Sequence, residues 1–326
     1  MPPMPNPQGV YLGVDVGSVS TNFVLVDPQR SPHEAVVWKK YLRTQGAPLV
    51  ILQQGLRSLQ EDGSWEVLGV GTTGSGRHLA GAVLGADVVK NEITAHAIGA
   101  QQLEPKVRTI IEIGGQDSKL IILRDGVVVD FAMNTVCAAG TGSFLDQQAG
   151  RLNIPITEFG PLALQSQNPV RIAGRCTVFA ESDMIHKQQL GHGMADILAG
   201  LCQAMIRNYL SNVAKGKKLQ PKVLFQGGVA ANVGMQRFLQ EALRHEVVVP
   251  EHYDVMGALG AAYLAQENLE RKGDGATRFV GFKLLDSSFQ SRARLCGECP
   301  NNCEIVEIWR DNEFLASWGS RCGRSN

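Results

Sequence analysis

One arrangement of residues occurs twice in this chain and limits how the chain can fold. Each copy is an apolar strand that ends in an acidic residue and a glycine turn, Val10–Ser18 in the first copy and Thr109–Asp117 in the second. A second apolar strand follows each turn, Asn22–Asp27 and Ser118–Leu123 respectively, as expected for a hairpin. Aligning VDVG of the first copy with IEIG of the second suggests that the chain contains two duplicated halves.

The remaining pattern favours an α/β fold with a small extra segment at the C-terminal end. A third glycine turn, Gly227–Gly228, follows another apolar strand and precedes a helix. Asn91 is expected to cap a helix that runs to Leu103. The domains we expect are a first half at 8–108, a second half at 109–269, a polar linker at 270–290 and a cysteine-rich tail at 291–326.

Charge and composition exclude several kinds of partner. The chain has 31 basic and 31 acidic residues and a net charge of zero, which gives no reason to expect nucleic acid or an anionic membrane. No apolar run is long enough to cross a bilayer, and the Pro-rich start at 1–7 lacks the apolar region of a signal peptide. We therefore expect a cytoplasmic protein, in which the seven cysteines serve as metal or redox groups rather than disulfides.

The glycine turns and the acidic residues suit a nucleotide with its metal ion. Backbone N–H groups in two such turns can hold the β- and γ-phosphates from two sides. Asp15 and Glu112 can hold Mg²⁺ through water molecules, because Mg²⁺ gives up its hydration shell reluctantly. Gly227 and Gly228 would let the backbone approach the nucleoside closely. The alternative is an α/β protein in which all of these are ordinary turns.

Two cysteines each stand just before a predicted helix, Cys137 in the segment Asn134–Asp146 and Cys176 in the segment Gly174–Asp183. A helix start favours an anion such as a thiolate, because its N–H groups lack partners. The alternative is that both are small buried side chains. No nearby His–Asn pair supports a catalytic nucleophile. If both are ligands of one four-ligand site, a symmetric dimer is the simplest source of the other two ligands.

Four further cysteines lie close together in the tail: Cys296, Cys299, Cys303 and Cys322. Their spacing is typical of a zinc site or an iron–sulfur cluster, and the sequence does not choose between them. A metal could organise a segment that has little core of its own, whereas a disordered tail is the alternative. Cys202 lies among apolar helical positions, so we expect it in the core.

The two hairpin motifs, Gly13–Thr21 and Ile113–Lys119, resemble the phosphate hairpins of the acetate kinase/sugar kinase/Hsp70/actin superfamily. Within that superfamily, the segments Asn134–Gly142 and Cys176–Ser182 resemble the ATP-dependent activators of 2-hydroxyacyl-CoA dehydratases and the related ATPase subunits of benzoyl-CoA reductases. The resemblance covers about Val10–Gln266. It implies two RNase H-like halves of the actin/Hsp70 type, with a nucleotide cleft between them.

The resemblance also implies cofactors and partners. By this resemblance we expect a homodimer that holds one [4Fe-4S] cluster through Cys137 and Cys176 of each subunit. Each subunit would bind Mg-ATP. ATP binding and hydrolysis would drive one low-potential electron onto an iron–sulfur partner: a dehydratase, a benzoyl-CoA reductase-like protein or a double-cubane-cluster protein. Ferredoxin or flavodoxin is the expected donor, and the activity is expected to be oxygen-sensitive.

The same resemblance assigns the site residues. Asp15 and Glu112 would bind Mg²⁺, and Gln116 would contact the phosphates or the attacking water. We further expect Gly140–Gly142 to lie toward the phosphates, between the nucleotide and the cluster. The residues expected at ATP are Gly17, Ser18, Ser20, Thr21, Asn22, Gly115, Gln116, Asp117, Gly140, Thr141, Gly227, Gly228 and Asn232.

Three features depart from the family pattern. Glu112 stands where many members have Asp, and Asn22 stands where many have Lys. The tail from about Phe282 is absent from the short activators and resembles longer members, some of which pair with double-cubane-cluster proteins.

Two other functions use the same fold. A sugar-type kinase would leave both cysteine motifs unexplained, and a non-enzymatic nucleotide switch would be indifferent to them.

Overall fold

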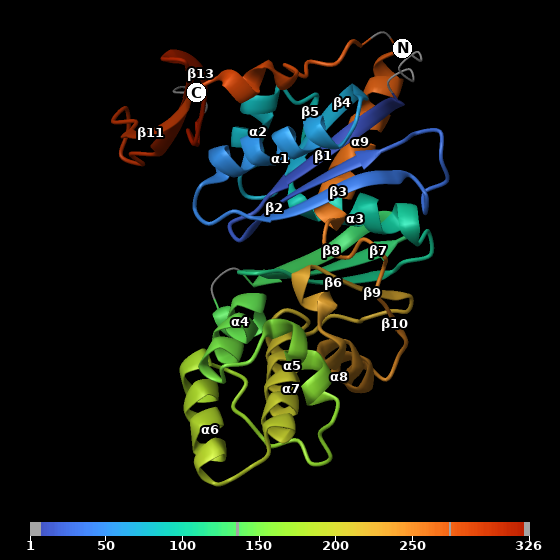
Figure 1. Ribbon diagram of the computed structural model, residues 1–326, viewed down its shortest axis with the longest axis vertical. Coiled ribbons are helices and arrows are strands. Elements are labelled where there is room, and N and C mark those ends of the chain that lie inside the picture. Colours follow the sequence, from blue (N-terminus) through green and yellow to red (C-terminus); the bar gives the residue numbers. More distant parts are fainter. Residues whose placement is uncertain (1–7, 135–136, 274, 323–326) are drawn as a thin grey trace. The chain divides into compact units, whose positions relative to one another are not determined.

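The computed structural model describes residues 8–134, 137–273 and 275–322, so the Pro-rich start lies outside the described residues. Within this part of the chain, residues up to Gly99 and from Gly257 onward form one compact unit, and Ala100–Met256 form the other. Each unit contains a five-stranded mixed sheet, and a small three-stranded sheet lies near the C-terminal end (Figure 1). The predicted α/β fold is confirmed. The domain boundaries expected from the sequence stay a prediction.

The sheet of the first unit has the strand order β3-β2-β1-β4-β5. Strand β1 pairs antiparallel with β2 and parallel with β4. All five residues at 10–14 of β1 are buried, as expected for a central strand that is covered on both faces. The strands are β1 (Gln8–Val16), β2 (Ser20–Val26), β3 (Val36–Arg43), β4 (Trp65–Thr73) and β5 (Val88–Val89).

The helices of the first unit are α1 (Pro48–Asp62), α2 (Arg77–Leu84), α3 (Glu92–Leu103, which continues past the unit boundary) and α9 (Met256–Lys272). Helix α1 begins with a proline and buries Leu52, Leu56 and Leu59, which recur at helical spacing. The predicted cap of α3 is confirmed, because Asn91 Oδ1 accepts the N–H of Thr94 over 2.9 Å.

The sheet of the second unit repeats the arrangement of the first. Its order, β8-β7-β6-β9-β10, again places three antiparallel strands before two parallel ones. Both sheets therefore follow the same path, and the duplication expected from the sequence is present in the strand order. The strands are β6 (Thr109–Ile113), β7 (Ser118–Arg124), β8 (Val127–Asn134), β9 (Val223–Gln226) and β10 (Val247–Val248).

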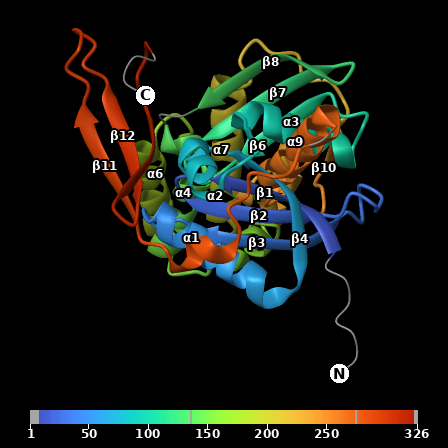
Figure 2. The ribbon, with the colours of Figure 1, turned by 90° about the horizontal axis from the view of Figure 1, so that it is seen from above.

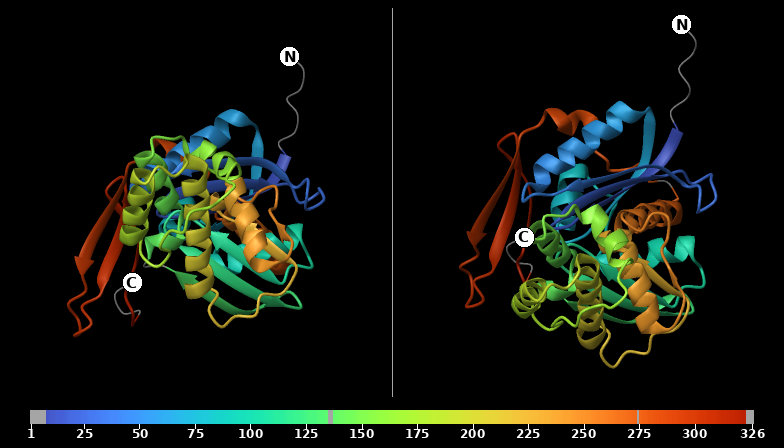
Figure 3. Two further views of the ribbon diagram at one scale, coloured as in Figure 1. Left: turned by 90° about the horizontal axis from the view of Figure 1, so that it is seen from below. Right: turned by 60° about the horizontal axis from the view of Figure 1, so that its bottom comes forward.

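The helices of the second unit lie together on one side of its sheet (Figures 1 and 3). They are α4 (Gly142–Arg151), α5 (Ile156–Ala163), α6 (Thr177–Gln189), α7 (Met194–Asn212) and α8 (Val233–Leu243). Phe144, Phe159, Tyr209 and Phe225 fill the core. Cys202 is also fully buried there, as predicted, and burial raises the pKa of its thiol to about 12. Within the described residues, no helix combines the length and apolarity needed to cross a bilayer.

The C-terminal segment is attached to the first unit. The carboxylate of Asp87 accepts three hydrogen bonds, from the N–H of Val70 (2.8 Å), the hydroxyl of Thr277 (2.7 Å) and the N–H of Arg278 (2.9 Å). Ile308 belongs to the apolar core of that unit. The third sheet consists of β11 (Phe289–Leu295), β12 (Glu304–Arg310) and β13 (Glu313–Trp318), and Figure 2 shows β11 and β12 as a long hairpin.

Candidate functional site

The first glycine turn is a tight three-residue connection, Gly17–Val19, between β1 and β2. The N–H of Gly17 donates to the carbonyl oxygen of Ser20 over 2.8 Å, which closes the turn. Ser18 is exposed at the tip, whereas Thr21 is fully buried and its hydroxyl lies 3.0 Å from the hydroxyl of Thr44. Thr44 also donates to the Gly17 carbonyl oxygen over 2.9 Å. Thr21 thus supports the turn from behind, and Ser18 is the side chain that a phosphate can reach.

Asp15, near the end of β1, lies beside two side chains whose oxygen atoms could bind a metal ion. It lies directly opposite Asn22 on β2 and Thr73 on β4, so the three side chains project from one face of the sheet. Asn22 Oδ1 and Thr73 Oγ1 are buried and have no hydrogen-bond partner among the described residues. A Cβ at Gly257 would lie 2.1 Å from Asp15 Oδ2, so only glycine fits there. A carboxylate beside amide and hydroxyl oxygens suits Mg²⁺ and its waters, so these residues fit the expected ion.

The second glycine turn, between β6 and β7, repeats the geometry of the first. The N–H of Gly114 donates to the carbonyl oxygen of Asp117 over 3.0 Å. Glu112 occupies the place in β6 that the acidic residue of the first hairpin occupies in β1. Gln116 is exposed at the tip and Gly115 is half-buried beside it. Both turns therefore offer an exposed backbone loop with a carboxylate behind it.

Lys119 is a residue to which the sequence reasoning assigned no role. It lies opposite Glu112, as Asn22 lies opposite Asp15. Its ammonium is 2.9 Å from Glu112 Oε2 and 2.8 Å from Asp117 Oδ1, and its side chain is only 3% exposed. Burial raises the pKa of Glu112, and attraction to Lys119 opposes that rise. Position 22, where a lysine was expected from the family pattern, is therefore equivalent to position 119 in the other half, which does carry a lysine. Aligning the two hairpins in the sequence could have revealed this equivalence.

The third glycine turn packs against the second hairpin. Gly227 has φ of +89°, and a Cβ there would lie 2.6 Å from Glu112 Oε1, so both its conformation and its surroundings require glycine. Its N–H donates to the carbonyl oxygen of Tyr253 over 2.8 Å. Gly228 is exposed. Asn232 is the N-cap of α8, where its Oδ1 accepts a backbone N–H of the first turn over 3.0 Å. Its expected place near the nucleoside stays a prediction.

The two cysteines of the central motifs come from neighbouring loops. Cys137 immediately precedes the short helix Ala138–Gly140, and Cys176 immediately precedes α6. The sulfur of Cys137 lies 3.9 Å from the carbonyl oxygen of Arg175, so the two loops meet. Asn134 fixes the first loop, because its amide donates to the Cys137 carbonyl (2.7 Å) and accepts the Cys137 N–H (3.0 Å). Positions 135 and 136 of this motif lie outside the described residues.

Asn208 on α7 joins these two loops from the inside of the unit. It is only 2% exposed, and its amide donates to the carbonyl oxygen of Gly174, two residues before Cys176. A Cβ at Gly140 would lie 2.9 Å from its Oδ1, so the loop of Cys137 passes against the same side chain. Two thiols at helix starts, held from a common support, fit half of the four ligands that an iron–sulfur cluster requires.

The loop of Cys137 is hydrogen-bonded to the second glycine turn. The N–H of Gly142 donates to the carbonyl oxygen of Gly114 over 2.8 Å, and the N–H of Ser143 donates to that of Gly115 over 2.8 Å. The Ser143 hydroxyl also donates to the Gly115 carbonyl, over 2.6 Å. Thr141 is fully buried and its hydroxyl donates to a carbonyl oxygen of its own loop over 2.8 Å. Helix α4 therefore begins directly on the second glycine turn.

Two large apolar side chains are exposed just after Cys176. Val178 and Phe179 lie in the first turn of α6 and are each 66% exposed. Adjacent exposed apolar side chains of this size often mark a protein–protein interface.

The tail cysteines are only partly brought together. The N–H of Cys296 donates to the carbonyl oxygen of Cys303 over 2.8 Å, which closes the β11–β12 hairpin. Cys299 and Cys322 are exposed, the first in the connecting loop and the second after β13. Within residues 8–134, 137–273 and 275–322, no three His, Cys, Asp or Glu side chains lie close enough to hold a metal ion. The tail metal stays a prediction.

Several known proteins are similar to this chain over most of their length. The (R)-2-hydroxyglutaryl-CoA dehydratase activating ATPase of Acidaminococcus fermentans is 33% identical over 256 residues, which are 78% of this chain and 96% of that protein. The activator of lactoyl-CoA dehydratase of Anaerotignum propionicum is 35% identical over 266 residues, 80% of this chain and 99% of the activator.

A solved structure and a family comparison agree with these relatives. The structure of the 2-hydroxyisocaproyl-CoA dehydratase activator from Clostridium difficile with bound ADPNP has a TM-score of 0.72 and 32% identity, and the match covers 81% of this chain and 97% of the activator. The family that the motifs indicated is therefore confirmed. Residues 12–265 match the BadF/BadG/BcrA/BcrD ATPase family, and the chain belongs to that family.

Proposed function

We propose that this chain is an ATP-driven activator that passes a low-potential electron to an iron–sulfur partner protein of the 2-hydroxyacyl-CoA dehydratase, benzoyl-CoA reductase or double-cubane-cluster type. Its family is one of ATPases, and its relatives are named as activators of such dehydratases. The observation that carries the proposal is the pair of backbone hydrogen bonds that join the Cys137 loop to the second glycine turn, each 2.8 Å long. Neither a sugar kinase nor a nucleotide switch would explain why a turn expected to bind phosphate is hydrogen-bonded to a loop that carries a cysteine.

ATP would be held through its phosphates by the backbone of both glycine turns. Asp15, with the orphaned oxygens of Asn22 and Thr73 beside it, would hold Mg²⁺ through water. Lys119 would supply positive charge behind the second turn, and Gln116 at the tip would orient the attacking water. The expected Mg²⁺ role of Glu112 stays a prediction, since Lys119 holds its Oε2.

Loss of the terminal phosphate of ATP would move the cysteine loops through main-chain hydrogen bonds. A turn that grips a phosphate shifts when that phosphate leaves, as in other nucleotide-dependent switches. Gly142 and Ser143 are bonded to the turn, so the start of α4 would move with it. Asn208 touches both cysteine loops, so both would respond together.

Cys137 and Cys176 would hold half of a [4Fe-4S] cluster, and the same residues of a second copy would hold the other half. When bound, the cluster would store one electron at low potential, supplied by ferredoxin or flavodoxin. The chain's own contribution is to hold both thiols in place, each immediately before a helix. A homodimer would also cover Val178 and Phe179.

The experiment that tests this proposal compares two variants under anaerobic conditions. Asp15→Asn should lower Mg-ATP hydrolysis about 100-fold or more while the iron content stays unchanged, as expected when a charge that holds the metal is lost. Cys137→Ser/Cys176→Ser should bind Mg-ADPNP normally but lose the iron and the electron transfer. If this double variant instead phosphorylates sugars as fast as the unmodified chain, the protein is a kinase and the proposal fails.

A further inference from the structure

A polar groove opens beside the cysteine loops of the second unit. Its volume is about 530 Å³, and it is lined by Arg175, Ser211, Asn212 and Lys215. Arg175 immediately precedes Cys176, and its carbonyl oxygen lies 3.9 Å from the sulfur of Cys137. The groove is therefore immediately adjacent to both thiols.

The charge of this groove is positive. Arg175 and Lys215 are exposed, and neither has an ion-pair partner among the residues that the structure describes. Two further arginines lie nearby, Arg171 in the same loop as Arg175 and Arg207 on α7, where Arg207 donates to the carbonyl oxygen of Ile172 over 2.8 Å. Burial lowers the pKa of Arg207, and the nearby charge of Arg171 lowers it further. Asp183 lies on α6, where its carboxylate accepts the N–H of Ala173 over 2.8 Å. Among the described residues that line the groove, none carries a carboxylate.

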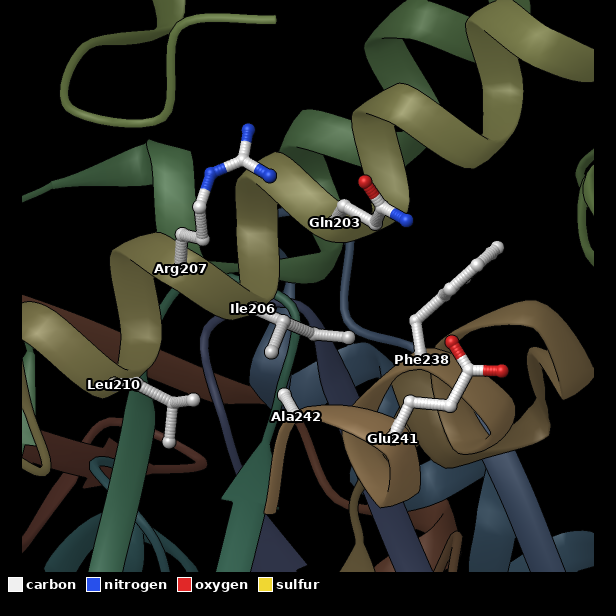
Figure 4. A pocket seen from close by; sticks show the side chains of 7 residues that line it. All are labelled: Gln203, Ile206, Arg207, Leu210, Phe238, Glu241 and Ala242. Carbon is white, nitrogen blue, oxygen red and sulfur yellow. The ribbon is translucent and has the colours of Figure 1, made fainter. Parts of the chain in front are cut away.

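A second groove in the same unit lacks this character. It lies between α7 and α8, and Figure 4 shows the side chains of the two helices on either side of it. Its lining includes one guanidinium, of Arg207, and one carboxylate, of Glu241, and the rest is largely apolar. The charges of this second groove are balanced, whereas the lining of the first groove includes two basic side chains, Arg175 and Lys215.

We propose that the groove lined by Arg175, Ser211, Asn212 and Lys215 docks surface carboxylates of the redox protein that donates the electron. This inference rests on the proposed function, because it assumes that electrons enter at Cys137 and Cys176. Electron-transfer encounters use small contact areas and depend on complementary charge for a fast approach. Carboxylates seated between Arg175 and Lys215 would bring the donor's redox centre against the loop that carries both cysteines.

The first test measures binding rather than electron transfer. The probe is an acidic ferredoxin with two [4Fe-4S] clusters, titrated anaerobically by calorimetry into the full chain at low and high ionic strength. Lys215→Glu should weaken its Kd about tenfold at low salt, and the difference should shrink at high salt because exposed charges are screened. Lys106→Glu is the matched control: Lys106 is exposed in the same unit, in the loop before β6. Equal weakening by both variants would show that only net charge matters and would overturn the inference.

The second test locates the contact. A carbodiimide joins a lysine amine to a carboxylate only when the two groups touch, so the mapped cross-link between ferredoxin and this chain should fall at Lys215. Cross-links only at other lysines would overturn the inference, as would a groove that binds inorganic phosphate but not ferredoxin. Iron analysis separates the two claims. A chain that binds cluster iron but not ferredoxin contradicts the docking site alone. A chain that binds ferredoxin at Lys215 but no iron contradicts the proposed function and supports the docking site.

Discussion

Replacing Lys119 by methionine tests how the second hairpin is held. The lysine side chain is 3% exposed and its ammonium contacts Glu112 and Asp117 at 2.9 and 2.8 Å. Methionine has a similar length and no charge, so the substitution leaves the buried carboxylate of Glu112 without its partner. Removing one member of a buried ion pair costs about 3–5 kcal/mol of unfolding free energy, and we expect Lys119→Met to fall in that range at neutral pH.

The cost should depend on pH in a defined direction. Burial raises the pKa of Glu112 in the folded protein above its ordinary value. Between these two pKa values the folded state holds a proton that the unfolded state has lost, so the free energy of unfolding falls as the pH rises. Loss of Lys119 removes the attraction that opposes this rise, so the folded-state pKa of Glu112 goes higher still. The stability difference between Lys119→Met and the unmodified chain should therefore narrow as the pH falls, because Glu112 then takes up a proton.

Hydrogen exchange followed by mass spectrometry measures this locally, through the amides of β6 and β7. Adding Glu112→Gln to Lys119→Met should restore about 2 kcal/mol, because no buried charge is then left unpaired.

Lys217→Met is the matched control. Its ammonium lies 2.6 Å from Asp130, but the two side chains are 24% and 46% exposed, so little change is expected. Equal losses in Lys119→Met and Lys217→Met would refute the reasoning.

Two further predictions concern the supports of the cysteine loops and of the tail. Asn208→Ala leaves the carbonyl of Gly174 without its donor, so the second unit should lose about 1–3 kcal/mol in urea unfolding and release iron faster to a chelator. Asn212→Ala, an exposed position on the same helix, should do neither, and equal effects would contradict a specific role. Asp87→Ala removes the acceptor of three hydrogen bonds, two of them from Thr277 and its neighbour. Trypsin should then cleave the segment after α9 much faster than in the unmodified chain. Mg-ATP hydrolysis should stay within about twofold, because the three groups that bond to the Asp87 carboxylate belong to Val70, Thr277 and Arg278, which were not assigned to ATP. Unchanged cleavage would show that Asp87 does not hold the tail.

The features that the sequence predicted correctly are mainly local ones. A hairpin depends on a turn and two adjacent strands, so both glycine turns and the duplication could be recognised from residues close in the chain. The cap at Asn91 is a contact over three residues, and the burial of Cys202 follows from helical spacing.

The features that the sequence did not reveal depend on distant contacts. Asn208 meets Gly174 across 34 residues, and nothing in the pattern of α7 distinguishes it from a neutral polar residue. Asp87 meets Thr277 across 190 residues, so a stretch that reads as a polar linker is attached to the first unit. Lys119 is an intermediate case: its partner Glu112 is only seven residues away, but it also meets α7 across 90 residues, where the Tyr209 hydroxyl donates to its carbonyl oxygen.

The most direct test of the central claim is the iron and acid-labile sulfide content of the anaerobically reconstituted chain, measured together with its oligomeric state. A cluster shared through Cys137 and Cys176 predicts a dimer with about four irons and four sulfides per two chains. This content should persist when Cys296, Cys299 and Cys303 are changed to serine, apart from any tail metal. It should vanish, without loss of folding, in Cys137→Ser/Cys176→Ser. A colourless dimer, or a double variant that keeps its iron, would contradict the account.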